Sequence, residues 1–553
     1  MERYYIDDYG RTLREDDDTI VADFNVKLVT VEKYITAENK CYEVFTLDFY
    51  KDEFICRYKL SPDELDKQNY YDIDSRLLLS PVVSSASKEI AYFIRCQVTS
   101  AEIKEFKFFD KLGWHKFDGE HFYCAGDTLI GSLDNYFIKE HLSETYHLEI
   151  DRDMTELSAL EHTFDLIKIE PEITSLIFIF GLIGITRQLI KDANIKIPSA
   201  LYIDGNTQTR KTTTSKLLTC MYNRSLLESD ISVSGTRVNS TNIKVEELAE
   251  KLKDTSFILD DLYRQSDTKL RKEYESHVRN LIRNFADNTP RSTARSSYEI
   301  NCQLIITAEY LLKSLTDLGR TVIVHVSKPI NSERLSYCQK QPLGLSTFYY
   351  YFIKWLSVNY SKIVERLRSE YITFREQAKD HKSNYERLYE SWFLLKIVFE
   401  IYLDYAIEVG AEVNKKSLTD GFYRYVQKTF AFESKILKRV KASEAEKLNF
   451  SRELISMINS GIIKVTKKGD NCFGKGRYLY ITNNYFARKL YDKYGKVFSA
   501  KSITAYFRDR SISEAYDDNT NKKYRGKRYL VLNKDFLNED ANDINDKIDK
   551  LFF

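Results

Sequence analysis

Hydrophobic and polar positions follow different periods in different parts of the chain. Between about residues 25 and 150, runs rich in β-branched and aromatic residues, such as 42–50 and 52–58, predict strands. Apolar strand-like runs then alternate with helical patterns, which is typical of an α/β core. From about residue 343 the apolar spacing is helical, as in 348–356 and 390–403, until short strands return near Ile462.

These patterns predict a multidomain α/β protein with four regions. We expect an N-terminal α+β domain (1–160), a P-loop core (161–340), a helical lid and linker (341–440) and a basic winged-helix region (441–553). Ser61 is a candidate helix cap in the first region. The apolar run 174–185 is too short to cross the ~30 Å of membrane hydrocarbon, so it predicts a buried helix that begins near Pro171.

Composition sharpens this picture at the two ends of the chain. The 553 residues carry a net charge of +1, but the first 24 hold eight acidic and three basic side chains, whereas 433–535 hold 24 basic and 11 acidic ones. Eight scattered cysteines without a Cys-x-x-Cys pair favour reduced thiols. The acidic start does not resemble a signal peptide, so we expect a cytoplasmic protein without a membrane partner. Trp114 and His115 are expected to pack in the interior.

A polar loop between an apolar run and a helical pattern carries the strongest chemical signal. Its spacing is that of a phosphate-binding loop, in which backbone N–H groups and a helix N-terminus face the phosphates. An arginine stands where the second glycine is expected, so its side chain either hinders the phosphates or adds positive charge. A chance Lys-Thr turn is the alternative. The predicted nucleotide-binding residues are Gly205, Asn206, Thr207, Gln208, Thr209, Arg210, Lys211, Thr212 and Thr213.

Two later apolar strands end in polar residues that suit the same chemistry. The first ends in Asp260 and Asp261, which predicts Mg²⁺ support by Thr212 and Asp260 and positioning of the attacking water by Asp261. A strand that ends in a solvated turn is the alternative. The second ends in Thr307, which is placed to sense the γ-phosphate. ATP and Mg²⁺ are therefore the expected substrate and cofactor.

Two arginines are candidates for contact with phosphate groups from further away. Arg320 precedes the apolar strand 321–326, where an arginine can reach the nucleotide of a neighbouring subunit; a solvated strand cap is the alternative. Arg387, at the start of a helix in the lid region, is the candidate for a second phosphate sensor. Because such a site needs a partner's arginine, we expect a homo-oligomeric ring, most commonly a hexamer.

Four segments together resemble a known family. These segments are 112–124, the apolar helix 174–185, the strand 257–261 and the strand 305–309. They are similar to the MCM-like AAA+ self-loading replicative helicases of staphylococcal mobile elements, the Cch and Rep type of cassette chromosomes and pathogenicity islands. The resemblance implies an N-terminal domain, an AAA+ motor, a C-terminal winged helix and a hexamer that unwinds DNA at an origin.

Basic residues in two places predict DNA contacts. Arg291 and Arg295 lie in a polar insert before the strand that ends in Thr307, where MCM-like motors carry a hairpin into a pore for single-stranded DNA. Near the C-terminus an amphipathic helix is followed by a basic, wing-like segment, which predicts duplex binding. The residues are Lys501, Arg508, Arg510, Lys522, Lys523, Arg525, Lys527 and Arg528. Surface loops and solvated faces are the alternatives, and the segment 452–481 leaves open a second small basic module.

The sequence thus predicts an ATP-dependent DNA helicase for replication of a mobile genetic element. Two other functions remain open at this level. One is an origin-binding initiator that uses ATP as a switch without processive unwinding. The other is a DNA-binding protein whose P-loop core is inactive because Arg210 replaces the usual glycine.

Overall fold

The computed structural model divides the chain into two compact units, Met1–Lys435 and Ile436–Phe553. The structure describes residues 4–65, 67, 86–226, 235–263, 266–287, 291–292, 297–298, 300–312, 314–378, 386–445, 450–466, 471–494, 498–509, 521–524 and 527–533. None of the helices formed by these residues is long and apolar enough to cross a membrane.

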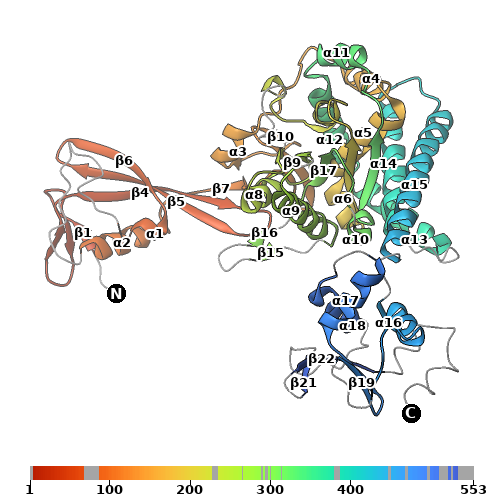
Figure 1. The fold of residues 1–553 in the computed structure, drawn as a ribbon. Coiled ribbons are helices and arrows are strands. Elements are labelled where there is room, and N and C mark those ends of the chain that lie inside the picture. The colour runs from red at the N-terminus through yellow and green to blue at the C-terminus, as the bar shows by residue number, and fades with distance from the viewer. Residues whose placement is uncertain are drawn as a thin grey trace. The chain divides into compact units, whose positions relative to one another are not determined.

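In the residues that the structure describes, the first unit begins with two β-sheets and two helices (Figure 1). One sheet has the order β1-β2-β3, and the other has the order β11-β7-β4-β5-β6. Ser61 precedes α1, and its backbone N–H donates to the Glu64 carboxylate, which is one of the two bonds of a capping box; its hydroxyl donates to the same carboxylate. The elements are β1 Tyr4–Ile6, β2 Thr12–Arg14, β3 Ile20–Ala22, β4 Asn25–Ile35, β5 Cys41–Lys51, β6 Phe54–Leu60, α1 Pro62–Leu65, α2 Ala86–Cys96, β7 Glu102–Phe109 and β11 Tyr136–Ile138.

A small antiparallel sheet follows and is tied to the core by buried hydrogen bonds. It has the order β10-β9-β8, with β8 Gly113–Phe117, β9 Glu120–Ala125 and β10 Thr128–Ile130, and α3 Glu140–Thr145 comes after it. The indole Nε1 of Trp114 donates to Ile185 O at 2.8 Å, and the hydroxyl of Tyr123 donates to Asp254 O at 2.8 Å. Burial lowers the pKa of His115 to about 3, so the expectation that Trp114 and His115 pack in the interior is confirmed.

The core is a parallel five-stranded sheet with the order β13-β14-β17-β12-β18. The expected apolar helix, α5, is buried from Thr174 to Ile185 and packs against α7 and the sheet. The strands are β12 Ala200–Gly205, β13 Gly235–Arg237, β14 Ser256–Leu262, β17 Gln303–Ala308 and β18 Thr321–Val326. The helices are α4 Glu156–Ile167, α5 Pro171–Ile185, α6 Arg187–Asp192, α7 Lys211–Thr219, α8 Asn242–Lys251, α9 Thr268–Asp287 and α10 Leu315–Leu318; a 3₁₀ turn spans Arg224–Leu226. A hairpin of β15 Arg291–Ser292 and β16 Ser297–Tyr298 lies between α9 and β17.

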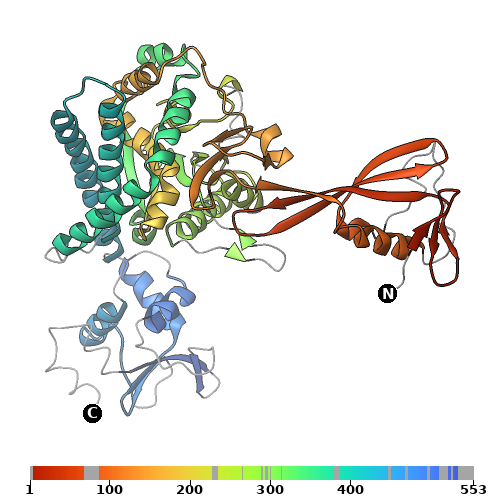
Figure 2. The same cartoon turned by 180° about the vertical axis from the view of Figure 1, so that it is seen from behind.

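Among the described residues, four helices and the part of α15 up to Lys435 complete the first unit, and the helical pattern predicted for this region is confirmed. The expected segments 348–356 and 390–403 fall within α12 and α14. The helix α14 packs on α5, and α14 and α15 lie side by side in both views (Figures 1 and 2). The helices are α11 Ser332–Gln339, α12 Gly344–Val358, α13 Tyr360–Ala378, α14 Glu386–Glu408 and α15 Lys415–Ala445.

Among its described residues, the second unit combines the end of α15 and three further helices with an antiparallel sheet of order β19-β20-β22-β21. The apolar face expected of the amphipathic helix near the C-terminus is confirmed, because Ile503 and Phe507 are buried in the core of the unit. The suggestion of a separate module at 452–481 is wrong, since β20 pairs with β22 and α16 shares that same core. The elements are α16 Phe450–Asn459, β19 Cys472–Lys475, β20 Tyr478–Ile481, α17 Asn483–Tyr494, α18 Ala500–Asp509, β21 Asn521–Tyr524 and β22 Lys527–Asn533.

Candidate nucleotide site

The candidate phosphate-binding loop connects the central strand β12 to α7. It lies at the carboxyl edge of the parallel sheet, where ligands of open α/β sheets bind. A Cβ atom at Gly205 would lie 2.4 Å from Val326 O on the neighbouring strand, so only glycine fits there. The helix α7 begins at Lys211, and its first-turn N–H groups therefore face the loop.

Arg210 takes the left-handed backbone conformation that explains why glycine is usual at this position. Its φ is 64° and its ψ is 25°. Its guanidinium Nη1 donates to Ile330 O at 2.8 Å, in the segment that follows β18. Thus the side chain is bound to a neighbouring segment outside the loop, and this bond offers a reason why an arginine is accommodated.

Lys211 is held by oxygens of its own loop. Its Nζ donates to Gly205 O at 2.8 Å, to Asn206 O at 2.9 Å and to Thr209 Oγ1 at 3.1 Å. Burial lowers the pKa of its ammonium, and the carboxylates of Glu309 and Asp204 oppose that shift. The cation therefore lies over the loop, where a phosphate would compete with neutral oxygens for its three N–H groups.

Three elements bring their predicted polar residues together beside the loop. Asp260 Oδ1 on β14 accepts from Thr212 Oγ1 on α7 and from Thr307 Oγ1 on β17, each at 2.5 Å. This contact is possible because β17 lies between the loop strand and the strand that carries the carboxylates. The hydroxyls thus fix the orientation of the Asp260 carboxylate at the sheet edge.

Asp261 occupies a bulge in β14, next to that cluster. The register between β14 and β17 shifts between Leu259 and Leu262, and Asp261 has a φ of 70°. Its backbone N–H donates to Thr307 Oγ1 at 3.1 Å. Burial, and then the charges of Asp260 and Glu309, raise the pKa of the Asp261 carboxyl above its ordinary value.

The structure adds residues to the site that the sequence motifs did not assign. Glu309 follows β17 and accepts from Thr207 Oγ1 at 2.5 Å, so it holds the tip of the loop. Asp204 lies directly before Gly205, and its Oδ2 is 2.9 Å from His325 Nδ1 on β18. The signal for Glu309 and Asp204 in the sequence was their position, because each lies within two residues of one already assigned.

A cavity of about 280 Å³ adjoins the first turn of α7. Arg224, which is buried in its wall, donates through Nε to Pro342 O at 2.7 Å and through Nη1 to Cys220 O at 3.0 Å. These bonds hold the cavity wall beside Thr212. The lining residues are Thr212, Thr213, Lys216, Leu217, Arg224, Gln339 and Pro342.

Arg320 and Arg387 lie together, away from the loop of their own chain. Both bind the carboxylate of Asp287 at the end of α9, Arg320 at 3.1 Å and Arg387 at 2.8 Å. Burial would raise the pKa of Asp287, but these two hydrogen-bonded arginines hold it below its ordinary value. Arg320 precedes β18, at the amino edge of the sheet, whereas Gly205 ends β12 at the carboxyl edge. The six-residue β12 separates these edges by roughly 16 Å.

The predicted DNA-contact residues lie on the expected elements as far as the structure describes them. Arg291 pairs with Tyr298 in the β15–β16 hairpin, and the basic C-terminal residues follow the helix-and-hairpin order that was predicted. Lys501 and Arg508 lie on α18, Lys522 and Lys523 on β21, and the exposed Lys527 and Arg528 on β22. Arg295, Arg510 and Arg525 lie outside the described residues.

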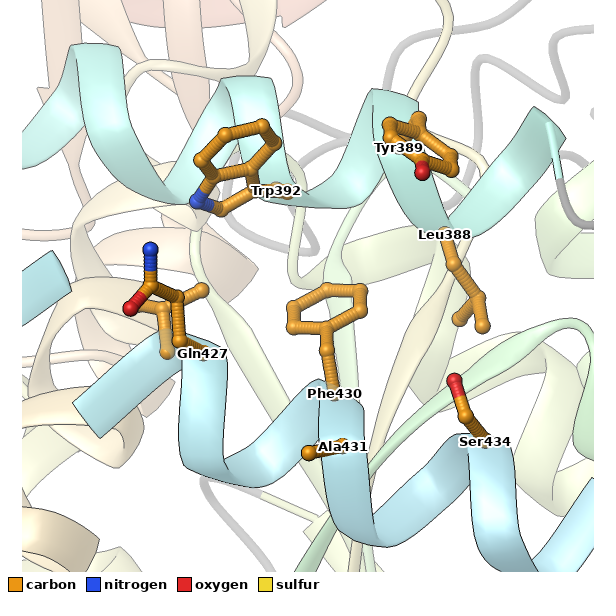
Figure 3. Close-up of a pocket in the computed structure, with 8 residues that line it drawn as sticks. Leu388, Tyr389, Trp392, Gln427, Phe430, Ala431 and Ser434 are labelled. Atoms are coloured by element: carbon orange, nitrogen blue, oxygen red, sulfur yellow. The ribbon is translucent and has the colours of Figure 1, made fainter. Parts of the chain in front are cut away.

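A further cavity, of about 290 Å³, lies between α14 and α15 and contains none of the predicted residues (Figure 3). Its lining is largely apolar, with Leu388, Tyr389 and Trp392 from α14 and Phe430 and Ala431 from α15. Within the described part of the chain, no group of three His, Cys, Asp or Glu side chains forms a metal site. All eight cysteines are free.

Helicases are among the solved structures that this chain resembles in fold. No family model and no curated protein matches the sequence. A solved structure titled "SCCmec type IV Cch - active helicase" is 14% identical, covers 97% of this chain and 98% of its own, and has a TM-score of 0.48. Another, "The X-ray structure of JCV Helicase", is 13% identical over 43% of this chain and 72% of its own, with a TM-score of 0.21. At these identities and TM-scores neither helicase transfers its activity to this chain.

Proposed function

We propose that this chain is an AAA+ ATPase that couples ATP hydrolysis to movement along DNA, as a DNA helicase. The observation that carries the proposal is the Thr212–Asp260–Thr307 cluster beside the phosphate-binding loop. The strand order supports the proposal, because β17 lies between the loop strand and the carboxylate strand and so brings Thr307 to the Asp260 carboxylate beside the loop.

In this proposal the loop residues bind the triphosphate and orient it. Lys211 exchanges its loop oxygens for the β- and γ-phosphates, while the backbone N–H groups from Asn206 to Thr213 surround them. Thr212 and, through water, Asp260 would hold Mg²⁺, which would supply positive charge beside the phosphates. Thr307 contacts the γ-phosphate, and Asp261 accepts hydrogen bonds from the attacking water and orients it.

The arginines act on the nucleotide of a neighbouring subunit. Because Arg320 and Arg387 lie at the opposite edge of the sheet from their own loop, each site needs a partner's arginines. A ring of identical subunits satisfies this need, and six is our proposed number. Asp287 keeps both guanidinium groups at this edge before they meet the partner's phosphates.

The DNA contacts are assigned to two places, in keeping with the basic residues there. Single-stranded DNA is expected at the β15–β16 hairpin, and duplex DNA at the second unit as a winged helix, with α18 and the β21–β22 hairpin. An origin-binding initiator with the same ATP site is the second candidate. The initiator stays a candidate because a basic second unit suits a protein that is anchored at an origin as well as one that moves along DNA.

ATP hydrolysis by the wild type and by Lys211→Ala, with and without single-stranded DNA, tests the ATP site. We expect DNA-dependent hydrolysis by the wild type and a loss of roughly 100-fold or more in the variant, because transition-state charge loses its cation. Equal hydrolysis by both proteins would remove the loop from the mechanism. Strand displacement on a forked duplex then separates a helicase from an initiator, since an initiator hydrolyses ATP without unwinding.

A further inference from the structure

A cationic cavity lies at the amino edge of the core sheet, on the side opposite to the nucleotide site. It has a volume of about 260 Å³ and lies between α6 and the end of α9. Its polar lining consists of three cations and two amides, and no carboxylate is among its described lining residues. These polar residues are Arg187, Lys191, Lys196, Asn194 and Asn301.

The buried wall of this cavity is built around Arg187. This residue is only 8% exposed, and its Nη2 donates to Ile300 O at 3.2 Å. Its guanidinium also lies over the ring of Phe285, 5.1 Å from the ring centre. These two contacts fix the direction of the guanidinium, whereas Lys191 and Lys196 are exposed and can turn toward a ligand.

One buried carboxylate lies close enough to influence these cations. Asp254 is fully buried, and burial raises its pKa, which Lys253, Arg187 and Lys191 partly oppose. Lys253 lies 3.6 Å from that carboxylate, and the backbone N–H of Trp114 donates to it at 2.9 Å. Since Asp254 already has these partners, the cavity keeps an excess of positive charge.

The position of the cavity indicates which anion it would bind. Asn301 follows Tyr298, the last residue of the β15–β16 hairpin, by three positions. The phosphate-binding loop is roughly 16 Å away along β12, so the nucleotide of the same chain does not extend here. The ring of Phe285 is already covered by Arg187, which leaves charge and amide groups for contact rather than a surface for base stacking.

We propose that this cavity binds a backbone phosphate of single-stranded DNA at the base of the β15–β16 hairpin. The proposal rests on the DNA-dependent motor inferred above and names a contact of that motor. The contact is independent of base sequence, because only phosphate oxygens meet the cations and amides. It also places a contact with DNA on the segment that leads directly into β17, the strand that carries Thr307.

The test measures binding of a labelled oligothymidine to the full chain without nucleotide, over a range of salt concentrations. The variant is the double substitution Lys191→Gln and Lys196→Gln. Its matched control is the double substitution Lys168→Gln and Lys428→Gln. Both lysines are exposed and lie near the start of α5, whereas the cavity adjoins the residues that follow its end: Lys168 precedes α5, and Lys428 contacts Glu172 in its first turn. We expect the variant to bind on the order of tenfold more weakly near 0.1 M salt and its salt slope to fall by about 1.4. The control should bind as the wild type does.

An unchanged affinity and salt slope in the K191Q/K196Q protein would overturn the proposal. The proposal also fails if that variant loses binding of inorganic phosphate, measured at constant ionic strength, but keeps its DNA affinity, because the cavity would then be a site for free phosphate. Hydrolysis of ATP by the wild type is measured separately. Its absence would contradict the proposed motor, while the DNA-binding comparison would still decide the role of the cavity.

Discussion

At the scale of single residues, Arg210 shows how a departure from a motif is accommodated. A non-glycine residue in the left-handed region costs about 1–2 kcal/mol, and the hydrogen bond from its guanidinium to Ile330 O offsets about 1 kcal/mol of this. Arg210 therefore makes a hydrogen bond that offsets part of the strain in its own backbone. The same bond holds the guanidinium at Ile330, which weakens the argument that a side chain at this position hinders the phosphates.

A pair of substitutions separates these two effects. Arg210→Ala keeps the left-handed strain and loses the hydrogen bond, so we expect its free energy of unfolding to fall by about 1 kcal/mol. Arg210→Gly loses the same bond but relieves the strain, and it should be more stable than R210A by about 1 kcal/mol. Urea unfolding of the three proteins measures both differences. An R210A protein as stable as the wild type would show that the bond to Ile330 contributes nothing.

At the scale of helices and strands, the sequence predicts elements better than it predicts their neighbours. The helices α5, α12 and α14 and the loop before α7 follow from apolar spacing and one local motif. Glu309 and His325 were missed because their partners, Thr207 and Asp204, lie 102 and 121 residues away. Such pairs form only when parallel strands adopt a particular order and register, which no single segment specifies.

The contact between α15 and the edge strand β18 has the same long-range origin. Glu433 on α15 is fully buried, and the ring of Phe432 beside it stacks on that of His325, with 5.3 Å between the ring centres. Burial raises the pKa of Glu433 well above its ordinary value, and neither of its carboxyl oxygens has a hydrogen-bond partner among the described residues. The helix therefore covers the open sheet edge at the expense of a buried carboxyl group.

This cost predicts a pH-dependent effect of Glu433→Gln. Because the folded-state pKa is raised, the wild type has its full stability below the ordinary pKa of about 4.3, and it loses stability as the pH rises from there toward the folded pKa. Glutamine cannot ionise, so we expect the free energy of unfolding of E433Q to exceed that of the wild type near neutral pH by at least about 1 kcal/mol. Urea unfolding at several pH values measures this difference, which should shrink toward pH 4. A constant difference across this range would mean that Glu433 does not titrate on folding.

At the scale of the whole molecule, the proposed ATP site is divided between subunits. The loop, Asp260 and Thr307 lie at one edge of the core sheet, and Arg320 and Arg387 lie at the other, both on Asp287. A chain built in this way supplies one half of two different sites. Lys211→Ala destroys the half that binds phosphates, whereas Arg320→Ala destroys the half that is offered to the neighbour.

Mixing these two inactive variants should therefore restore activity. In a randomly mixed ring with equal amounts of each, about a quarter of the interfaces join an intact loop to an intact arginine. We expect the mixture to regain ATP hydrolysis toward that fraction of the wild-type rate, measured after dissociation and reassembly of the oligomers. Each variant mixed with itself is the control. If Arg320 instead served the loop of its own chain, no subunit in the mixture would hold a complete site, and hydrolysis would stay at the level of the separate variants.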